Sequence, residues 1–312
     1  MEPLARHALV IGHLTVDDIV LPTGETAMET AGGDSLYASL GVRIWGVIPR
    51  LIASRPQGYP VRILNAIQEK GVDTDYLQTV SVPGVRQWAL YDQKGGRQYH
   101  LQTGSSTYDD ISPCVDKAGA LPDPIFAAHV APMPSHVQYD WVRWLAKRQC
   151  RWILVDPHED ALRDWEIWKR ILSYTTVFLP SEVEVAGLLG PNINGLDAAR
   201  RLSQWGPRIV VIKRGPHGSL FYDRETNQAR EFSALAVEAV DPTGCGDAYC
   251  GGFAAALCII GDPGVGAEWG TVSASFVLES YGPHRVMHVN VEEAMHRWQL
   301  YRTQQERREG SL

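Results

Sequence analysis

Short apolar runs alternate with helical patterns along this sequence, and this alternation is the feature that most constrains its fold. The first run, 7–12 (HALVIG), is apolar and ends at glycine, which is typical of a buried strand. Similar runs recur at 126–131, 152–155, 176–179 and 209–212. Helical patterns lie at 35–45, 61–70, 137–148, 181–189 and 196–205. Strands joined by helices pair in parallel, so we predict a three-layer α/β/α sandwich with a mostly parallel central sheet.

One region, 85–101 (VRQWALYDQKGGRQYHL), departs from this alternation. Two strand-like arms flank Lys94-Gly95-Gly96, and paired glycines supply the positive φ values of tight turns, so an antiparallel hairpin is predicted. A hairpin outside an α/β core is a candidate lid, although the local pattern fits a surface hairpin without a role equally well. Beyond residue 241 the pattern is helical, over 245–260, 266–279 and 291–302.

Composition and charge restrict the function. The 312 residues carry a formal net charge of -7, so no overall basic field attracts nucleic acid or an anionic membrane. The five cysteines are scattered, without CxxC pairs, which indicates a reducing, cytoplasmic setting. No stretch has the roughly 20 apolar residues of a spanning helix, and the first residues do not resemble a signal peptide. We therefore expect a cytoplasmic protein that binds neither nucleic acid nor a membrane.

The segment 237–257 (VEAVDPTGCGDAYCGGFAAAL) is the most informative part of the chain. An apolar strand end leads into a glycine-rich loop, and a helix begins there. Unpaired amides and the positive end of the helix dipole make such a turn an anion site. Gly244 and Gly246 lack side chains that would keep a phosphate away from those amides.

Asp247 lies in the first turn of this predicted helix. A carboxylate there could accept the proton of an alcohol held in line with a phosphoryl group. An acid at a helix start is also common for structural reasons, and glycine-rich turns are frequent. The local pattern leaves both interpretations open.

The motif DPTGCGDAYCGG resembles the C-terminal motif of the PfkB, or ribokinase-like, carbohydrate kinases, D-T-x-G-A-G-D. The resemblance implies that Asp247 is the catalytic base and that the amides of Gly244, Cys245 and Gly246 form an anion hole. Asp241 and Thr243 would border a monovalent-cation (K⁺) site, which only some members use.

Two N-terminal segments resemble the substrate-binding motifs of the same family. VIGHLTVDDIV would place Asp17 on the substrate hydroxyls, and AGGDSLYASLGVRIWG would place Gly32 and Gly33 along the substrate site. Tyr37 stands where an asparagine is common in the family, which favours stacking on a ring face over fixed hydrogen bonds.

Two further segments resemble the nucleotide-binding motifs. LPSEVEVAGLLG is similar to N-x-x-E with serine in place of asparagine, so Glu184 would act on Mg²⁺ through water. IVVIKRGPHGSLFYD would place Lys213, Gly215 and Gly218 near ATP, with lysine where threonine is frequent.

The resemblance covers nearly the whole chain and implies a single ribokinase-like kinase domain over 1–312, with lid strands at about 14–22 and 85–103. It implies an ATP- and Mg²⁺-dependent phosphotransferase acting on a hydroxyl of a small sugar or cyclitol. A nucleoside is the second candidate substrate, and a homodimer through the lid is a further expectation. A catalytically silent sugar- or nucleotide-binding regulatory protein is the alternative from another class.

Overall fold

The computed structural model describes residues 5–93, 97–119, 121, 124–158 and 164–309. Its main element is an eight-stranded sheet in the order β14-β13-β12-β11-β10-β9-β1-β4. The strands from β4 to β12 are parallel to their neighbours, and β13 and β14 extend the sheet antiparallel. The strands are β1 (His7–Ile11), β4 (Ile48–Ile52), β9 (Ala127–Val130), β10 (Trp152–Val155), β11 (Val177–Phe178), β12 (Ile209–Lys213), β13 (Ser219–Asp223) and β14 (Gln228–Phe232). The predicted mostly parallel α/β architecture is confirmed.

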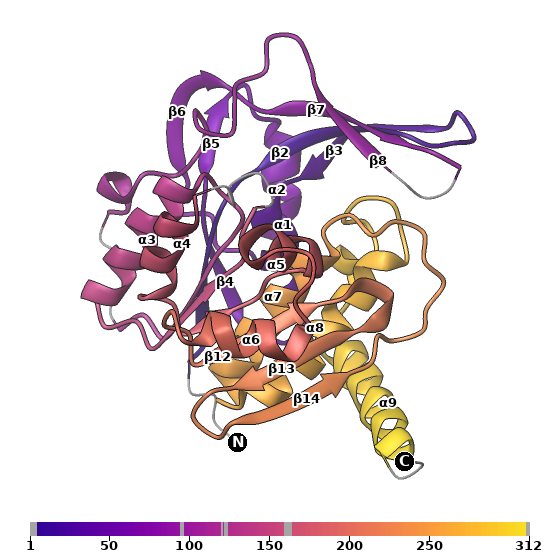
Figure 1. Cartoon of the computed structure of the whole chain (residues 1–312). Helices are drawn as coiled ribbons and strands as arrows, with labels where there is room; N and C mark the ends of the chain where they lie inside the picture. Colours follow the sequence, from indigo (N-terminus) through magenta and orange to yellow (C-terminus); the bar gives the residue numbers. More distant parts are fainter. Residues whose placement is uncertain (1–4, 94–96, 120, 122–123, 159–163, 310–312) are drawn as a thin grey trace.

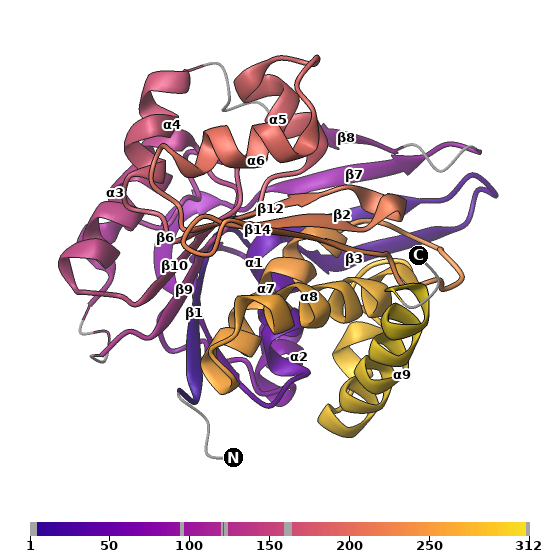
Figure 2. The same cartoon turned by 60° about the horizontal axis from the view of Figure 1, so that its bottom comes forward.

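Helices cover both faces of this sheet, which makes the three layers (Figures 1 and 2). One face carries α3 (Ser135–Lys147), α4 (Trp165–Leu172), α5 (Glu182–Leu189) and α6 (Gly195–Ser203). The other carries α1 (Asp34–Arg43), α2 (Val61–Glu69), α7 (Cys245–Ile259), α8 (Pro263–Leu278) and α9 (Val291–Glu309). In the described part of the chain, no helix combines the length and apolarity needed to cross a bilayer.

Strand β1 shows why a continuous apolar run is needed at the centre of the sheet. Leu9 and Ile11 pack into the core beneath α3 to α6, whereas Ala8 and Val10 pack into the core beneath α1, α7 and α8. Successive side chains of a strand point to opposite faces, so a strand covered on both sides is apolar at every position.

A separate four-stranded sheet, in the order β3-β2-β7-β8, lies across one end of the sandwich (Figure 1). Its strands are β2 (Thr15–Val20), β3 (Thr26–Gly32), β7 (Arg86–Tyr91) and β8 (Arg97–Leu101). The arms β7 and β8 pair antiparallel as the hairpin prediction requires, while the turn at 94–96 lies outside the described residues. Strand β3 was not predicted, and neither was the pair of β5 (Ser54–Gln57) with β6 (Gln78–Pro83).

Polar residues gather where the parallel strands end. Asp156 follows β10, Lys213 ends β12, and Glu184 follows β11 within α5. The carboxyl ends of parallel strands share one edge, which is where α/β proteins bind ligands. The N-terminus of α7 and the small sheet meet at this edge.

Candidate active site

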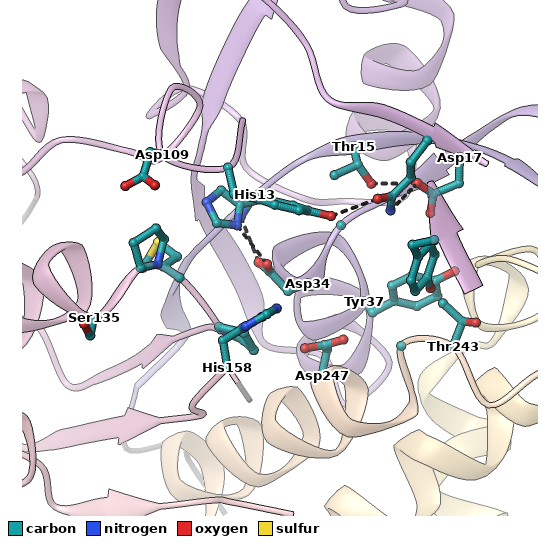
Figure 3. Close-up of a pocket in the computed structure, with 18 of the residues that line it drawn as sticks. His13, Thr15, Asp17, Asp34, Tyr37, Asp109, Ser135, His158, Thr243 and Asp247 are labelled. Atoms are coloured by element: carbon teal, nitrogen blue, oxygen red, sulfur yellow. Dashed lines mark hydrogen bonds and ion pairs between the residues drawn. The ribbon is translucent and has the colours of Figure 1, made fainter. Parts of the chain in front are cut away.

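A cavity of about 520 Å³ opens between the small sheet and the N-terminus of α7 (Figure 3). This volume is in the usual range for small-molecule sites. Residues from distant parts of the sequence line it: His13, Thr15, Asp17, Gly33, Asp34, Tyr37, Gln87, Tyr99, Tyr108, Asp109, Pro132, Met133, Pro134, Ser135, His136, His158, Thr243, Gly244 and Asp247. Asp17 and Asp247, predicted to hold substrate and to act as base, therefore face one cavity.

Asp17 is held in place by neighbours on the small sheet. Its Oδ1 accepts hydrogen bonds from Thr15 Oγ1 and Gln87 Nε2, each at 3.0 Å, and the residue is only 5% exposed. Tyr108 donates to Gln87 Oε1 at 3.0 Å, which extends the network (Figure 3). A buried carboxylate fixed in this way can accept hydrogen bonds from the hydroxyl groups of a substrate that enters the cavity.

Gly32 and Gly33, both predicted to line the substrate site, lie too close to neighbouring atoms to carry a side chain. A β-carbon on Gly32 would lie 2.2 Å from Asp17 Oδ2, and one on Gly33 would lie 2.3 Å from the His13 carbonyl oxygen. Gly33 also has φ 105° at the start of α1, a conformation that favours glycine. Gly32 therefore lets the backbone lie against Asp17, and Gly33 lets it lie against the His13 carbonyl.

His13 and Asp34 form a second polar pair on the cavity wall. His13 Nδ1 lies 3.1 Å from Asp34 Oδ2, and the His13 amide donates to Asp34 Oδ1 at 2.8 Å. Sequence patterns did not single out Asp34, because an acidic residue at a helix start has an ordinary structural explanation.

Asp247 lies in the first turn of α7 and its carboxylate faces the cavity (Figure 3). The hydrogen bond from the Ala248 amide to the Gly244 carbonyl, at 2.9 Å, is the first of the helical pattern. Amides before this point lie ahead of the intrahelical ladder, so they and the helix dipole can serve an anion. The residues predicted to form the base and the anion site therefore share one helical turn.

Gly244 begins this helix in the left-handed region, with φ 78°. A β-carbon here would lie 2.2 Å from the ring of Tyr37, which is 3% exposed. Burial raises the pKa of Tyr37, and the negative charges of Asp17 and Asp241 add to this effect. Tyr37 thus lines the cavity, and its ring packs against Gly244 of the glycine loop.

Cys245 and Gly246 differ in their contacts. The Cys245 amide lies 3.2 Å from the Pro242 carbonyl oxygen, so the turn already uses one of the three amides expected in the anion hole. A β-carbon on Gly246 would lie 3.3 Å from Lys213 Nζ. A buried cation therefore lies beside the expected phosphate site.

Lys213 is paired with a buried carboxylate. Its Nζ lies 2.7 Å from both carboxylate oxygens of Asp156, which is 2% exposed. Burial acts to lower the pKa of Lys213, but the Asp156 carboxylate outweighs burial and the pKa is raised, so the ammonium stays charged. The sequence predicted Lys213 near ATP without indicating this partner.

Glu184 lies close to the same pair. It completes a capping box at the start of α5, where the Ser181 amide donates to its Oε2 at 2.5 Å. Burial, followed by the charge of Asp156, raises the pKa of Glu184 to about 7. Crowded carboxylates of this kind fit a hard divalent ion, which would relieve their repulsion, so Glu184 is suited to the Mg²⁺ role expected of it.

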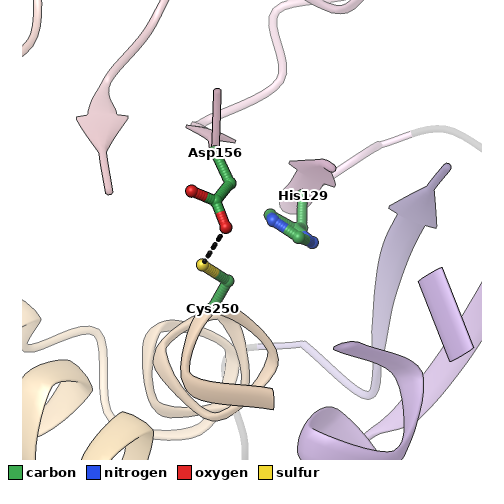
Figure 4. Close-up of side chains that lie close together, drawn as sticks. All are labelled: His129, Asp156 and Cys250. Atoms are coloured by element: carbon green, nitrogen blue, oxygen red, sulfur yellow. Dashed lines mark hydrogen bonds between the residues drawn. The ribbon is translucent and has the colours of Figure 1, made fainter. Parts of the chain in front are cut away.

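A buried cluster beneath α7 contains potential ligands for a transition metal (Figure 4). Ligand atoms of His129, Asp156 and Cys250 lie within 4.8 Å of one another. Burial lowers the pKa of His129 to about 3 and raises that of the Cys250 thiol, so both are neutral. Because the Lys213 ammonium already binds Asp156 and the thiol would have to lose its proton, a divalent ion is disfavoured here.

The turn predicted to lie near ATP contains two glycines with positive φ angles. Gly215 and Gly218 have φ 53° and 83° around a short 3₁₀ helix, and a β-carbon on Gly218 would lie 1.9 Å from the Phe232 carbonyl oxygen. A second cavity of about 570 Å³ lies against this turn, with Pro216 and His217 in its wall. The turn thus lies beside open space at the end of β12.

The first cavity is also lined by residues that the sequence did not indicate. Tyr108 and Asp109 come from the loop after β8, Met133 from the loop between β9 and α3, and His136 from the first turn of α3. His136 Nε2 lies 3.6 Å from Asp109 Oδ1. His158 also lines the cavity, close to Asp247 in Figure 3. Only the folded arrangement brings these separate loops together.

Residues 132–288 match the model of the pfkB family carbohydrate kinases. The chain belongs to the PfkB family, and it is a kinase. It is 28% identical over 261 residues to a cytidine kinase of Thermococcus kodakarensis, a match that covers 79% of this chain and 87% of the relative.

Solved structures show the same ribokinase fold. A nucleoside kinase of Burkholderia thailandensis in complex with inosine has a TM-score of 0.76 at 17% identity and covers 94% of this chain and 98% of its own. A fructokinase double mutant of Vibrio cholerae, with fructose, ADP and potassium bound, has a TM-score of 0.74 at 15% identity and covers 95% and 99%. At these identities the likeness concerns the fold alone.

Proposed function

We propose that this chain transfers the γ-phosphoryl group of MgATP to a hydroxyl of a sugar ring, with Asp247 as the base. The observation that carries the proposal is that Asp247 and Asp17 face one cavity at the N-terminus of α7. We further propose that the chain is one kinase domain and that the small sheet is its lid. A homodimer through this lid stays a prediction.

We propose the following reaction. Asp17 holds the acceptor ring, and Asp247 takes the hydroxyl proton as the alkoxide oxygen attacks the γ-phosphorus. The bond from the γ-phosphorus to the bridging oxygen breaks, and ADP leaves. The amides of Gly244 and Gly246 stabilise the charge on the transferring oxygens, as preorganised donors do.

The nucleotide is assigned to the other side of the glycine loop. We propose that Gly215 and Gly218 border ATP, and that Glu184 orients the Mg²⁺ ion, which neutralises charge on the phosphates. Lys213 adds a fixed positive charge behind Gly246. Asp241 and Thr243 remain the candidate residues for K⁺, and the Tyr91 hydroxyl already contacts both.

For the acceptor, we propose a nucleoside. The relatives named cytidine kinase and nucleoside kinase support this choice. The same cavity is also lined by Tyr108, Asp109, Met133 and His136, in addition to the residues around Asp17. An aromatic ring, a thioether and two hydrogen-bonding side chains suit a planar heterocycle. A free sugar or cyclitol, the substrate first expected from the sequence, has no planar base to contact these side chains.

An acceptor panel tests the proposal directly. ATP consumption is measured with cytidine, uridine, inosine, adenosine, ribose, fructose and myo-inositol, and the product is identified by phosphorus NMR. The proposal predicts turnover with at least one nucleoside at a higher kcat/KM than with any free sugar or cyclitol. Turnover with ribose or myo-inositol alone would leave the kinase assignment and reject the nucleoside. Nucleotide binding without turnover on any acceptor would support the silent regulatory protein.

A further inference from the structure

Strand β7 connects the two halves of the proposed reaction centre. Gln87, near its start, donates to Asp17 in the acceptor site. Tyr91, at its end, reaches the loop before α7. The two residues are four positions apart, and side chains at even spacing share one face of a strand. One face of one lid strand therefore contacts both the acceptor site and the glycine loop.

The contact made by Tyr91 is specific. Its hydroxyl donates to Asp241 Oδ1 at 2.6 Å and lies 2.5 Å from Thr243 Oγ1. The phenol has one proton, which goes to the carboxylate, so the Thr243 hydroxyl donates to the phenol oxygen. The Tyr91 ring also meets Tyr281 edge-on, with centroids 5.8 Å apart.

Asp241 connects the Tyr91 hydroxyl to the loop, because its carboxylate also accepts hydrogen bonds from backbone amides. Its Oδ1 also accepts the Thr243 amide at 2.8 Å, and its Oδ2 lies 3.4 Å from the Gly282 amide. The carboxylate is 1% exposed. A buried carboxylate is stable only while donors surround it, so loss of the Tyr91 hydroxyl would loosen the segment that leads into Gly244.

The protonation state of Tyr91 suits this role. Burial, followed by the hydrogen bond to Asp241, raises the pKa of Tyr91. The hydroxyl thus keeps its proton at neutral pH, and the contact is a hydrogen bond from a neutral donor to a charged acceptor, which is among the stronger kinds.

We propose that Tyr91 is a positioning residue that latches the lid to the 241–244 loop, so that the anion hole takes its working shape only while the lid is in place. This inference rests on the proposed function. Tyr91 does not touch the reacting atoms: it acts through Asp241 and Thr243 on Gly244. Closure of the lid over an acceptor and assembly of the phosphoryl site are then one event.

The test compares Tyr91→Phe with a matched control, Tyr222→Phe. Tyr222 is a tyrosine of β13 whose hydroxyl donates to Asn227 Oδ1 at 3.1 Å, away from the cavity. Both changes remove one hydroxyl and keep the ring. Amide hydrogen exchange of residues 241–247 is followed by mass spectrometry in the free proteins, and kcat and KM are measured with MgATP and the preferred acceptor of the panel.

Tyr91→Phe should speed exchange in 241–247 and lower kcat by roughly 10- to 100-fold, the effect of one lost hydrogen bond to a charged group. KM for ATP should stay within about threefold, and Tyr222→Phe should change neither exchange in this segment nor kcat. Unchanged exchange in Tyr91→Phe would overturn the latch, and so would faster exchange with normal kcat. A wild-type protein without turnover on any acceptor would instead defeat the proposed function, whereas the exchange result would still report on the contact.

Discussion

The ammonium of Lys213 lies 2.7 Å from both carboxylate oxygens of Asp156, and a β-carbon on Gly246 would come within 3.3 Å of that ammonium. The pair thus joins the ends of β10 and β12 directly behind the first turn of α7. Because Asp156 is buried and the Lys213 side chain is only 14% exposed, each depends on the other for its charge.

Breaking this pair should destabilise the fold. Lys213→Met alone or Asp156→Asn alone leaves one buried charge without its partner and should lower the free energy of unfolding by about 3–5 kcal/mol. The double variant removes both charges and should lose much less than the sum of the two. Urea denaturation measures all four proteins, and additive losses would contradict the buried pair.

The double variant also tests the electrostatic role of Lys213. If its charge stabilises the transferring phosphoryl group, the double variant should keep a cooperative unfolding transition and still show a lower kcat. Recovery of both stability and kcat would mean that the pair is only structural.

Glu184 should make Mg²⁺ binding depend on pH near neutrality. Its pKa of about 7 means that the carboxyl of the free protein is mostly protonated at pH 6 and mostly ionised at pH 8. Mg²⁺ needs the ionised form, so the apparent affinity for Mg²⁺ at fixed ATP should weaken as pH falls through 7. Glu184→Gln should weaken Mg²⁺ binding at pH 8 and remove this dependence, while exposed Glu166→Gln should keep it.

The same group affects stability with the opposite sign from an ordinary ion-paired acid. The ordinary pKa of a glutamate carboxyl is 4.5, so between that pH and about 7 the folded chain holds a proton that the unfolded chain has lost. The contribution of Glu184 to stability therefore falls as pH rises through this window. In Glu184→Gln this part of the pH dependence of urea denaturation should disappear.

Two glycines with nearly equal backbone angles allow a controlled test of the glycine loop. Gly244 has φ 78° and its β-carbon would meet the Tyr37 ring, whereas Gly58 has φ 79° and nothing within 4 Å. Gly58→Ala should have only the strain of a positive φ, about 1–2 kcal/mol, with normal turnover. Gly244→Ala should add the clash and lower kcat at least tenfold. Equal kcat in the two variants would show that Gly244 does not need its close contact.

Much of the scaffold could be predicted because each central strand is covered on both faces and is therefore apolar throughout. The run 152–155 coincides with β10, and the predicted helix 61–70 differs from α2 by one residue. Strands β13, β14 and β4 were not predicted, and a proline and an arginine interrupt the apolar pattern of β4. Helix α4 was also not among the predicted helices.

The site was predictable where the chemistry is local. The turn that holds Gly244 and Asp247 is continuous in sequence, so its glycines and acid could be interpreted together. Pairs such as Lys213 with Asp156, or Tyr91 with Asp241, join residues 57 and 150 positions apart, and a sequence pattern contains nothing about such contacts. The contact between Asp109 and His136 arises in the same way, from a loop and the start of α3.

Asp109 should distinguish a nucleoside from a free sugar. If the nucleobase of the acceptor lies against Asp109, Asp109→Ala should raise KM for the preferred nucleoside by about tenfold and leave KM for ATP unchanged. Exposed Asp140→Ala, on the outer part of α3, is the matched control. An unchanged nucleoside KM in Asp109→Ala would indicate that the base does not reach this end of the cavity.

The central claim is that Asp247 takes the proton of the acceptor hydroxyl, and Asp247→Asn tests it most directly. The measurement is kcat with the preferred acceptor, together with ATP affinity by calorimetry and the unfolding midpoint. Since general-base catalysis contributes about 100- to 10,000-fold, kcat should fall by that factor while ATP affinity and stability stay near wild type. A kcat within a few fold of wild type in a correctly folded Asp247→Asn protein would contradict the account.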